Sequence, residues 1–441
     1  MGAAVQIGFQ GYWPGRSGRL RRSLALAAGL LCLGAAAAAQ NNGAGLLSMV
    51  GQGQYDTARD ALAQVEHSPV DEAFLEAQIL AHQGRLVEAV EIYRAILAAS
   101  PDLVPVRQVL AQTLLNMGDF DAARFQFRTL MEAEANADLR VQYANALRLI
   151  DQQTPSGINA SLAIIPSTNV NRGTYNTSIQ AGALNFSIDP SSRQSSGVGL
   201  QFGLNGFWRK PVNSNSVLTF AAGASQTLYD DDQFNILQPY VSVAYSRTEP
   251  TSTWSLTGFA NRALRESGDD YTTYGMQYAA RRQLTGPNTL SYSLQAQQTD
   301  FDVQTVQSGP TYSLDVGVQR QINPTTSITG GVKLSRGLPE GDHLKFLSTS
   351  LYGGVSKNWR GGWTAFTGLE VGTRNYDANF TALPFEREDE FLTLRGSVLN
   401  STISYAGFAP RLNCTVQFNT SNVAFYDYNA TECSFELTRG F

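Results

Sequence analysis

The sequence is poor in charge, in histidine and in cysteine, and each shortage excludes a class of chemistry. Charged residues make up 16% of the 441 residues and the formal net charge is −5, so the chain lacks the basic surface that nucleic-acid binding needs. The three histidines, His67, His82 and His343, show no metal-ligand spacing with cysteines or paired carboxylates. No G-x-S-x-G motif and no phosphate-binding glycine loop occurs. The sequence therefore predicts no enzyme, no metal site and no cofactor.

Long apolar runs are also absent beyond the N-terminal region. No stretch of about 18 apolar residues follows residue 39, so no membrane-spanning helix is expected there. Gly 40, Tyr 18 and Phe 22, together with abundant Ser, Thr, Asn and Gln, favour strands and turns. A membrane protein of this composition has to be a β-barrel, because only helices and closed barrels satisfy the backbone in lipid.

An export signal is predicted over residues 1–39. Four arginines between residues 16 and 22 precede the apolar run "LALAAGLLCLGAAAAA", which ends in small residues before Gln40. This order is typical of a secretory signal cleaved near Ala39. A membrane anchor is the alternative, although the run is short for a bilayer span. After cleavage two cysteines remain, and an oxidising compartment permits a disulfide between them.

Residues 40–150 show a helical repeat. The segment is rich in Ala, Leu and Glu, with apolar residues at helical spacing, and matching positions recur 34 residues apart. These positions are Ala77 and Ala111, Gly84 and Gly118, Ala89 and Ala123, and Tyr93 and Phe127. A weaker copy precedes them at Gly53, Ala58 and Leu62. The period and the residue types resemble the tetratricopeptide repeat, in which Gly allows the tight turn and Ala the close approach of helices. Such stacks bind peptides or proteins, or serve as rigid spacers.

Residues 151–441 alternate with a period of two, which predicts a transmembrane antiparallel β-barrel. In "STWSLTGFANRA", Trp254 and Leu256 share one face and Ser255 and Thr257 the other. The segments run to about 10 or more residues, longer than the usual five or six of soluble sheets, and long enough to cross a bilayer at a tilt. The polar face would then line the lumen.

The breaks between these segments alternate between short turns and longer loops. Short turns such as "KPVNSN", "TEPTS" and "LTGPN" alternate with polar stretches such as "YDDDQF" and "LPEGDH". Outer-membrane barrels combine short periplasmic turns with longer outer loops. Counting the segments from Gly157 gives about fourteen strands, an even number that places both barrel ends on one side. The sequence thus predicts a periplasmic helical domain followed by a bacterial outer-membrane barrel.

The C-terminus has the pattern of a closing strand. Phe435 and Leu437 lie on an apolar face that leads to the terminal Phe441, which is expected at the membrane interface. Such an ending resembles the signal by which barrel-assembly machinery recognises outer-membrane barrels. Cys414 and Cys433 flank the last loop with the same parity, so antiparallel pairing places them within cross-linking reach. The alternative is two buried, unreactive thiols.

The signal, the short repeat domain and the barrel together resemble the surface lipoprotein assembly modifier (Slam) family. The most specific segments are "TSNVAFYDYNATECSFELTRGF" at the C-terminus and "PSTNVNRGT" after the first strand, which is similar to the family's Asp-Ser-Asn-Ile-Asn stretch. Asn169 and Asn171 match the family's two asparagines, whereas its aspartate and isoleucine are absent. Because asparagine tolerates left-handed turns, the two residues either shape the loop or contact the substrate directly.

The resemblance implies an outer-membrane translocon that moves client lipoproteins or secreted proteins to the bacterial surface. In this interpretation the periplasmic repeats engage the client or its chaperone, and the barrel offers a path or an edge for translocation. The other partners are outer-membrane lipid and the barrel-assembly machinery. Two alternatives remain: an exporter of secreted polysaccharide, a class that also joins such repeats to a barrel, and a diffusion porin with a periplasmic adaptor.

Overall fold

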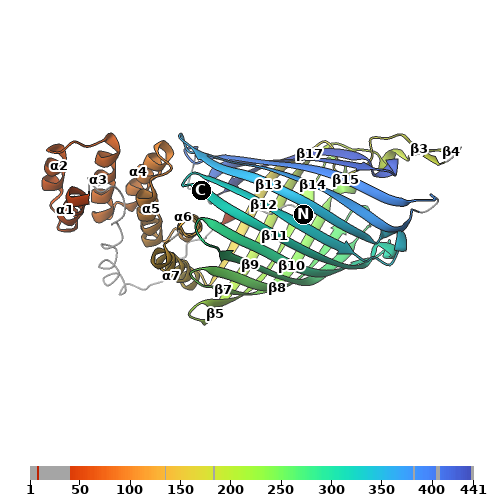
Figure 1. Ribbon diagram of the computed structural model, residues 1–441, viewed down its shortest axis with the longest axis horizontal. Helices are drawn as coiled ribbons and strands as arrows, with labels where there is room; N and C mark the ends of the chain where they lie inside the picture. Colours follow the sequence, from red (N-terminus) through yellow and green to blue (C-terminus); the bar gives the residue numbers. More distant parts are fainter. Residues whose placement is uncertain are drawn as a thin grey trace.

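The chain folds into an N-terminal stack of helices followed by a long β-barrel (Figure 1). The computed structural model describes residues 7–8, 40–134, 136–181, 184–380, 383–403 and 408–438. The predicted terminal residue Phe441, and the predicted signal apart from Ile7 and Gly8, lie outside this range. Within the described part of the chain, no helix is both long enough and apolar enough to span a membrane.

The helical domain consists of antiparallel helix pairs. Its helices are α1 (Gln40–Gly51), α2 (Tyr55–Ala63), α3 (Pro69–His82), α4 (Leu86–Ala99), α5 (Val104–Met117), α6 (Phe120–Ala133) and α7 (Ala137–Gln153). Ser68 opens α3 with a capping box, in which its hydroxyl accepts from the Asp71 amide and the Asp71 carboxylate accepts from the Ser68 amide. The boundary predicted at residue 150 falls inside α7, because the last turn continues to the Thr154 amide, which donates to the carbonyl of Ile150.

The repeat positions occupy the turns and the helix contacts of this stack. Gly84 and Gly118 both have φ of 82°, in the left-handed region that favours glycine. The four repeat alanines, Ala77, Ala89, Ala111 and Ala123, are fully buried at 0% exposure. Tyr93 is buried against them, with its ring centroid 6.0 Å from that of Phe74. Small side chains thus let neighbouring helices approach, and the aromatic rings fill the space beside them.

The barrel is one antiparallel sheet of neighbouring hairpins that closes on itself, with fourteen long strands. Its strands are β2 (Ser156–Ser167), β5 (Gly197–Asn213), β6 (Ser216–Leu228), β7 (Ile236–Thr248), β8 (Ser252–Arg265), β9 (Tyr271–Gln283), β10 (Asn288–Phe301), β11 (Gly309–Asn323), β12 (Thr326–Gly337), β13 (Phe346–Trp359), β14 (Trp363–Asn379), β15 (Glu386–Asn400), β16 (Ala409–Ser421) and β17 (Tyr428–Thr438). Strand β17 pairs with β2 and so closes the cylinder. The predicted fold class is confirmed.

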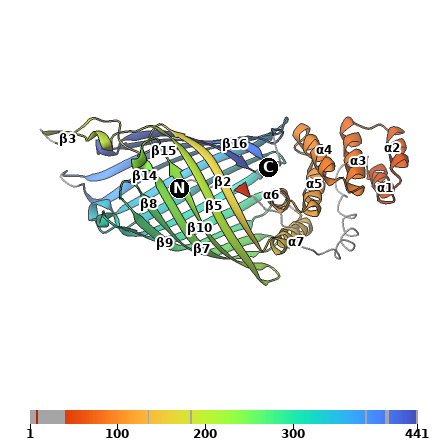
Figure 2. The ribbon, with the colours of Figure 1, turned by 180° about the vertical axis from the view of Figure 1, so that it is seen from behind.

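Three short strands lie apart from these fourteen. Ile7–Gly8 forms β1, which falls within the predicted signal and pairs with Ala160 and Asn159 of β2. A small hairpin of β3 (Ser178–Ala181) and β4 (Leu184–Ser187) projects from the loop between β2 and β5. Figure 2 shows this hairpin at the end of the barrel opposite the helices.

Short turns and long loops segregate to opposite ends of the barrel. The helical domain contacts three of the predicted short turns, at Ser214, Pro250 and Gly361. At the other end, several loops carry single 3-10 turns, η3 (Asp232–Phe234), η4 (Thr305–Gln307), η5 (Asp342–Leu344) and η6 (Ala424–Tyr426). Strands β14 and β15 continue to the pair of Asn379 and Glu386, so the loop that joins them is short. The chain is therefore an outer-membrane barrel with its helical domain at the periplasmic end.

Candidate functional site: a polar lumen covered by the helical domain

Side chains of alternating parity separate an apolar exterior from a polar lumen. On β10, Leu294 is 51% exposed on the outer face, while the next residue, Gln295, accepts from the Gln277 amide on the inner face. On β13, Leu351 is 57% exposed, whereas its neighbour Ser350 is buried inside. Apolar residues can face lipid in this arrangement because every strand finds its backbone partners within the closed sheet.

The lumen wall formed by β12 to β15 carries an ion cluster around one buried carboxylate, that of Glu370. The Glu370 carboxylate accepts from the Lys333 ammonium at 2.9 Å and from the Arg395 guanidinium at 2.8 Å. Its second oxygen accepts from the Ser350 hydroxyl at 2.9 Å. With one carboxylate held between two cations, this cluster keeps a net positive charge on the inner side of the sheet.

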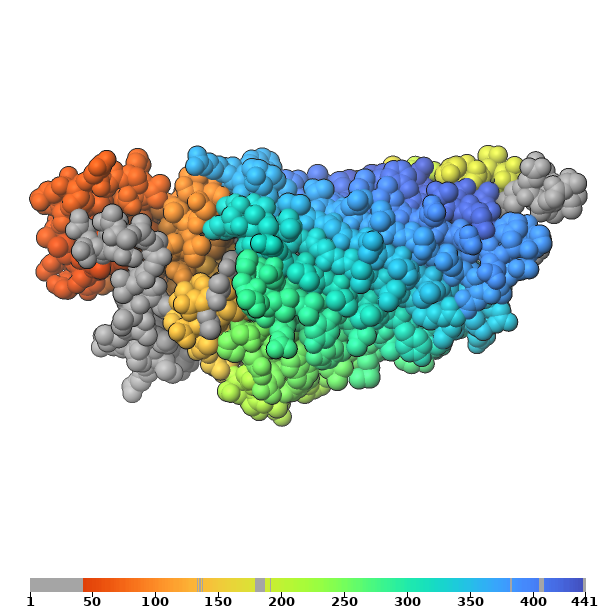
Figure 3. All heavy atoms as spheres, in the orientation of Figure 1, coloured from red at the N-terminus to blue at the C-terminus, as the bar shows by residue number. Residues whose placement is uncertain are grey.

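The helical domain covers the periplasmic mouth of this lumen. In the space-filling view the last helices of the helical domain meet the barrel end directly (Figure 3). Arg281 of β9 pairs with Glu132 of α6 at 2.5 Å. Arg124 of α6 pairs with Asp151 of α7, also at 2.5 Å, and Arg209 of β5 donates to the Thr154 carbonyl at 3.2 Å. Ionic and backbone contacts on several strands therefore fix the domain over the opening.

Arg140 of α7 makes a further docking contact and is buried, at 7% exposure. Its guanidinium donates to the Pro250 carbonyl at 2.7 Å and to the Gln283 side chain at 3.1 Å on the barrel. It also donates to the Met131 carbonyl at 2.5 Å within the helical domain. Burial lowers the pKa of Arg140, but a guanidinium remains protonated at any physiological pH. One fixed cation thus ties both domains together.

Replacement of Arg140 by alanine is expected to loosen the domain junction. Arg140→Ala leaves the Pro250 and Met131 carbonyls without their charged donor, at a cost of about 2–3 kcal/mol in docking. Hydrogen exchange of the turn around Pro250 should accelerate in the micelle-solubilised protein. Arg148→Ala on the same helix is the control, since Arg148 is only half-buried and its exposed bond to the Ser214 carbonyl is worth about 1 kcal/mol or less. Equal exchange in both variants would contradict this role for Arg140.

Three of the cavities lie where the helical domain meets the barrel. One of about 610 Å³ is bounded by Arg128 of α6 and by two ion pairs, Arg124 with Asp151 and Arg281 with Glu132. Another, of about 290 Å³, lies between α7 and the turns at Ser214 and Pro250. The smallest of the three has a volume of about 210 Å³, and three arginines but no carboxylates line it, among them Arg94 and Arg107. Burial lowers the pKa of Arg94, Arg107 and Arg128. The smallest of these cavities is therefore basic, and it favours acidic chain segments.

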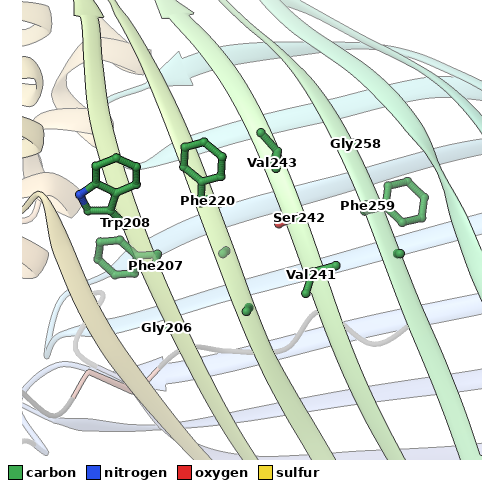
Figure 4. Close-up of a pocket in the computed structure, with 12 residues that line it drawn as sticks. Gly206, Phe207, Trp208, Phe220, Val241, Ser242, Val243, Gly258 and Phe259 are labelled. Atoms are coloured by element: carbon green, nitrogen blue, oxygen red, sulfur yellow. The ribbon is translucent and has the colours of Figure 1, made fainter.

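A further hollow, of about 560 Å³, lies on the outer wall (Figure 4). Trp208 and Phe220 stand side by side there, with ring centroids 5.4 Å apart, next to Val243. Gly206 and Gly258 have no side chains, so the surface is depressed between the larger neighbouring residues. All five residues share the parity of the exposed apolar face. The hollow therefore faces lipid and is separate from the lumen.

The loop after β2 places the two family-like asparagines at the extracellular end. Asn169 is 1% exposed, and its side-chain amide donates to the Gly173 carbonyl at 2.9 Å and to the Asn429 carbonyl at 2.8 Å. The Asn171 amide donates to the Arg193 carbonyl at 2.7 Å. Both side chains therefore act on the backbone of the loop and of β17, far from the helical domain.

The cysteine and C-terminal positions lie on β16 and β17. Cys414 faces Cys433 directly in the register, with Cα atoms 4.0 Å apart, and a disulfide joins them. Phe435 and Leu437 are 51% and 45% exposed on the apolar outer face. The predicted role of this C-terminus in barrel assembly stays a prediction, since Phe441 lies outside the described residues.

The described ranges contain no candidate metal site. No group of three or more His, Cys, Asp or Glu residues in them could hold a metal ion. The ion cluster at Glu370 and the docking of Arg140 were both missed by sequence reasoning. Lys333 and Glu370 do have the parity of the polar face, so the sequence signals that they line the lumen. It gives no sign that they meet, because they are 37 residues apart on β12 and β14.

Comparison with known proteins agrees with these features. The family model of the surface lipoprotein assembly modifier matches residues 157–441, and a tetratricopeptide repeat model matches residues 80–148. Surface lipoprotein assembly modifier 1 of Haemophilus influenzae is 21% identical over 420 residues, which cover 90% of this chain and 84% of that protein. A surface lipoprotein assembly modifier of Pasteurella multocida is 28% identical over 130 residues, which cover 30% of this chain and 25% of that protein.

Solved structures of other barrels resemble this chain at lower sequence identity. A Pseudomonas aeruginosa FadL homologue is 10% identical with a TM-score of 0.35, and the match covers 67% of this chain and 91% of that one. CdiB of Acinetobacter baumannii is 12% identical with a TM-score of 0.36, and the match covers 64% of this chain and 60% of that one.

Proposed function

Since the chain belongs to the surface lipoprotein assembly modifier family, we propose that it moves client lipoproteins through the outer membrane to the bacterial surface. The family and the barrel fold point to transport or assembly rather than to catalysis. In this proposal the helical repeats receive the client, or a chaperone that carries it, and pass it to the barrel.

One observation carries the proposal: the helical domain is seated on the mouth of the lumen. Arg140 and the pair of Arg281 and Glu132 hold it there, so any client that enters from the periplasm meets the repeats first. Arg94 and Arg107, which border the smallest cavity beneath the helical domain, make that part of the entrance attractive to acidic segments. A free diffusion pore would instead leave its mouth open to small solutes.

The lumen suits transient contact with an extended chain. Its wall presents Gln, Ser and Thr side chains together with the ion cluster around Glu370. Such groups can exchange hydrogen bonds with the backbone of a client that moves through the lumen. Polar side chains of this kind do not retain the client as an apolar pocket would.

The proposal is tested by deleting the gene and labelling intact cells with a membrane-impermeant biotin reagent. Proteins that lose surface labelling but persist in the cell, and that regain labelling with the full-length gene, are the expected clients. Complementation with a barrel that lacks residues 40–150 should restore assembly of the barrel but not surface labelling. If the deletion strain keeps every surface protein, the translocator proposal fails.

A second measurement separates the alternative functions. The purified protein in a planar bilayer is expected to show little steady conductance, because the helical domain covers the mouth. A stable, size-selective conductance of the full-length protein would favour a diffusion porin, and loss of surface polysaccharide in the deletion strain would favour an exporter of that class.

A further inference from the structure

The strand pair that closes the barrel is interrupted. The register of β17 with β2 joins Glu432 to Ser167, and then Phe435 to Ile164 and Glu436 to Ala163, with a gap between. The neighbouring pair of β16 and β17 runs without a break over its whole length. Within the described residues, this seam is therefore held by less backbone pairing than the adjacent hairpin.

Pro166 accounts for the gap. The amide of Thr168 donates across the seam to the Thr431 carbonyl at 2.9 Å. Alternate residues of a strand direct their amides to the same side, so residue 166 should be the next donor toward β17. Proline has no N–H, and prolines in sheets are confined to edges and irregularities for this reason. The sequence therefore removes a ladder bond at the seam itself.

The glutamate beside the seam adds a cost to the closed state. Glu436 is 8% exposed, and one of its carboxylate oxygens accepts from the Ser434 hydroxyl at 3.0 Å. The other oxygen is buried and has no hydrogen-bond partner among the described residues. A buried acceptor without a partner is destabilising, and separation of the strands would let water reach it.

Side chains of residues 168–176, which we call the seam loop, replace the missing pairing at the extracellular end. The Thr431 amide donates to the Thr168 hydroxyl at 2.9 Å, and Asn169 donates to the Asn429 carbonyl at 2.8 Å. The Thr174 hydroxyl donates to the Ala424 carbonyl of η6 at 2.8 Å. The Asn176 amide donates to the same carbonyl at 2.9 Å and to the Asp427 carboxylate at 3.1 Å. The loop that follows β2 thus bonds to β17 and to the turn that precedes β17.

The seam loop has a fixed internal shape. The Gly173 amide donates to the side-chain carbonyls of Asn169 at 2.9 Å and Asn171 at 3.2 Å. A Cβ added at Gly173 would lie 2.5 Å from the backbone carbonyl of Arg193, closer than real contacts allow. Arg172 has φ of 54° and pairs with Glu432 across the seam at 3.7 Å. The loop can therefore hold its partners only in this conformation.

We propose that the β2–β17 seam is a lateral exit for an extended client segment, and that the seam loop is the latch that keeps it closed. This inference rests on the proposed translocation function for the identity of its substrate. Separation of the two strands exposes rows of backbone N–H and C=O groups. An extended polypeptide can add to such an edge as a strand and leave sideways toward the membrane and the surface.

The latch is tested in the purified full-length protein, without a client. Ala163→Cys combined with Glu436→Cys places a thiol pair across the seam at registered positions. With the pair kept reduced, the rate of alkylation by a maleimide reports how often the seam opens and exposes the thiols. Gly173→Ala, or the milder Thr174→Val, should accelerate alkylation about fivefold, the effect of about 1 kcal/mol on a closed state that predominates. Glu340→Ala, in an exposed loop elsewhere, should leave the rate unchanged. Unchanged rates in both seam-loop variants would refute the latch.

The exit is tested in cells with the same thiol pair. The readout is surface biotinylation of the proteins that the gene deletion removes from the surface. Oxidation should abolish the appearance of newly made copies, and reduction should restore it. The control is Ser313→Cys with Ser335→Cys, a lumen-facing pair away from the seam whose hydroxyls lie 3.0 Å apart, and its cross-link should have no effect. Normal delivery through a cross-linked seam would refute the exit and leave the proposed function standing. A deletion strain that loses no surface protein would refute the proposed function, while the alkylation rates still decide the latch.

Discussion

Leu294→Arg is expected to prevent the protein from accumulating in the outer membrane. Leu294 lies at the middle of β10 and is 51% exposed on the outer face. Arginine on the lipid face of a barrel costs about 2–4 kcal/mol at the bilayer midplane. That cost is a large fraction of the stability of a folded domain. The heat-modifiable band of folded barrel in outer-membrane fractions should therefore disappear.

The adjacent residue provides a matched control. Gln295 is next to Leu294 on the same strand but points into the lumen, where its side chain accepts from Gln277 at 3.5 Å. Gln295→Arg places the same charge in contact with water and should leave the folded band in place. If the folded band persists in both variants, or disappears in both, the two faces of β10 do not differ as a lipid-facing and a lumen-facing surface.

The alternation behind this prediction was readable from the sequence. Trp254 and Leu256 share the outer face of β8 as expected, and the strand count, the short turns and the polar lumen agree with the structure. These features are local, since parity follows from the period of a strand and turns follow from Gly, Pro and Asn. The repeat glycines belong to the same class, because a left-handed turn selects glycine by itself.

Features that depend on distant contacts could not be read in this way. Arg140 meets Pro250 across 110 residues, and nothing near Arg140 in the sequence marks a partner. Asn169 meets Asn429 across 260 residues. The sequence left open whether Asn169 shapes a loop or contacts substrate, because both uses need the same amide. Only the closed barrel brings the end of β2 and its loop beside the last strand.

Different contacts thus keep the two ends of the barrel closed. At the periplasmic end a folded domain covers the mouth and is fixed by Arg140 and by Arg281. At the extracellular end the closing strands depend on side-chain bonds from the seam loop. Entry and exit can therefore be weakened separately, which allows each step of the proposed route to be tested alone.

Tyr93→Ala is expected to unfold the helical domain while the barrel remains intact. Tyr93 is fully buried at the centre of the repeat stack, against Phe74 and the repeat alanines. Removal of a buried aromatic side chain costs about 3–5 kcal/mol. A domain of this size has little stability beyond that amount. The repeats should become sensitive to trypsin, and the helical signal at 222 nm should melt at a lower temperature.

The same variant separates the role of the repeats from that of the barrel. The barrel has its own closed hydrogen-bonded sheet, so the heat-modifiable band of Tyr93→Ala should match the wild type. Surface labelling of the client proteins should nevertheless be lost, because the repeats receive the client. Val87→Ala is the control on the same helix, since Val87 is 60% exposed and its truncation costs about 0.5 kcal/mol or less. Normal surface labelling with unfolded repeats would show that clients reach the barrel without them, and would leave the helical domain as a spacer.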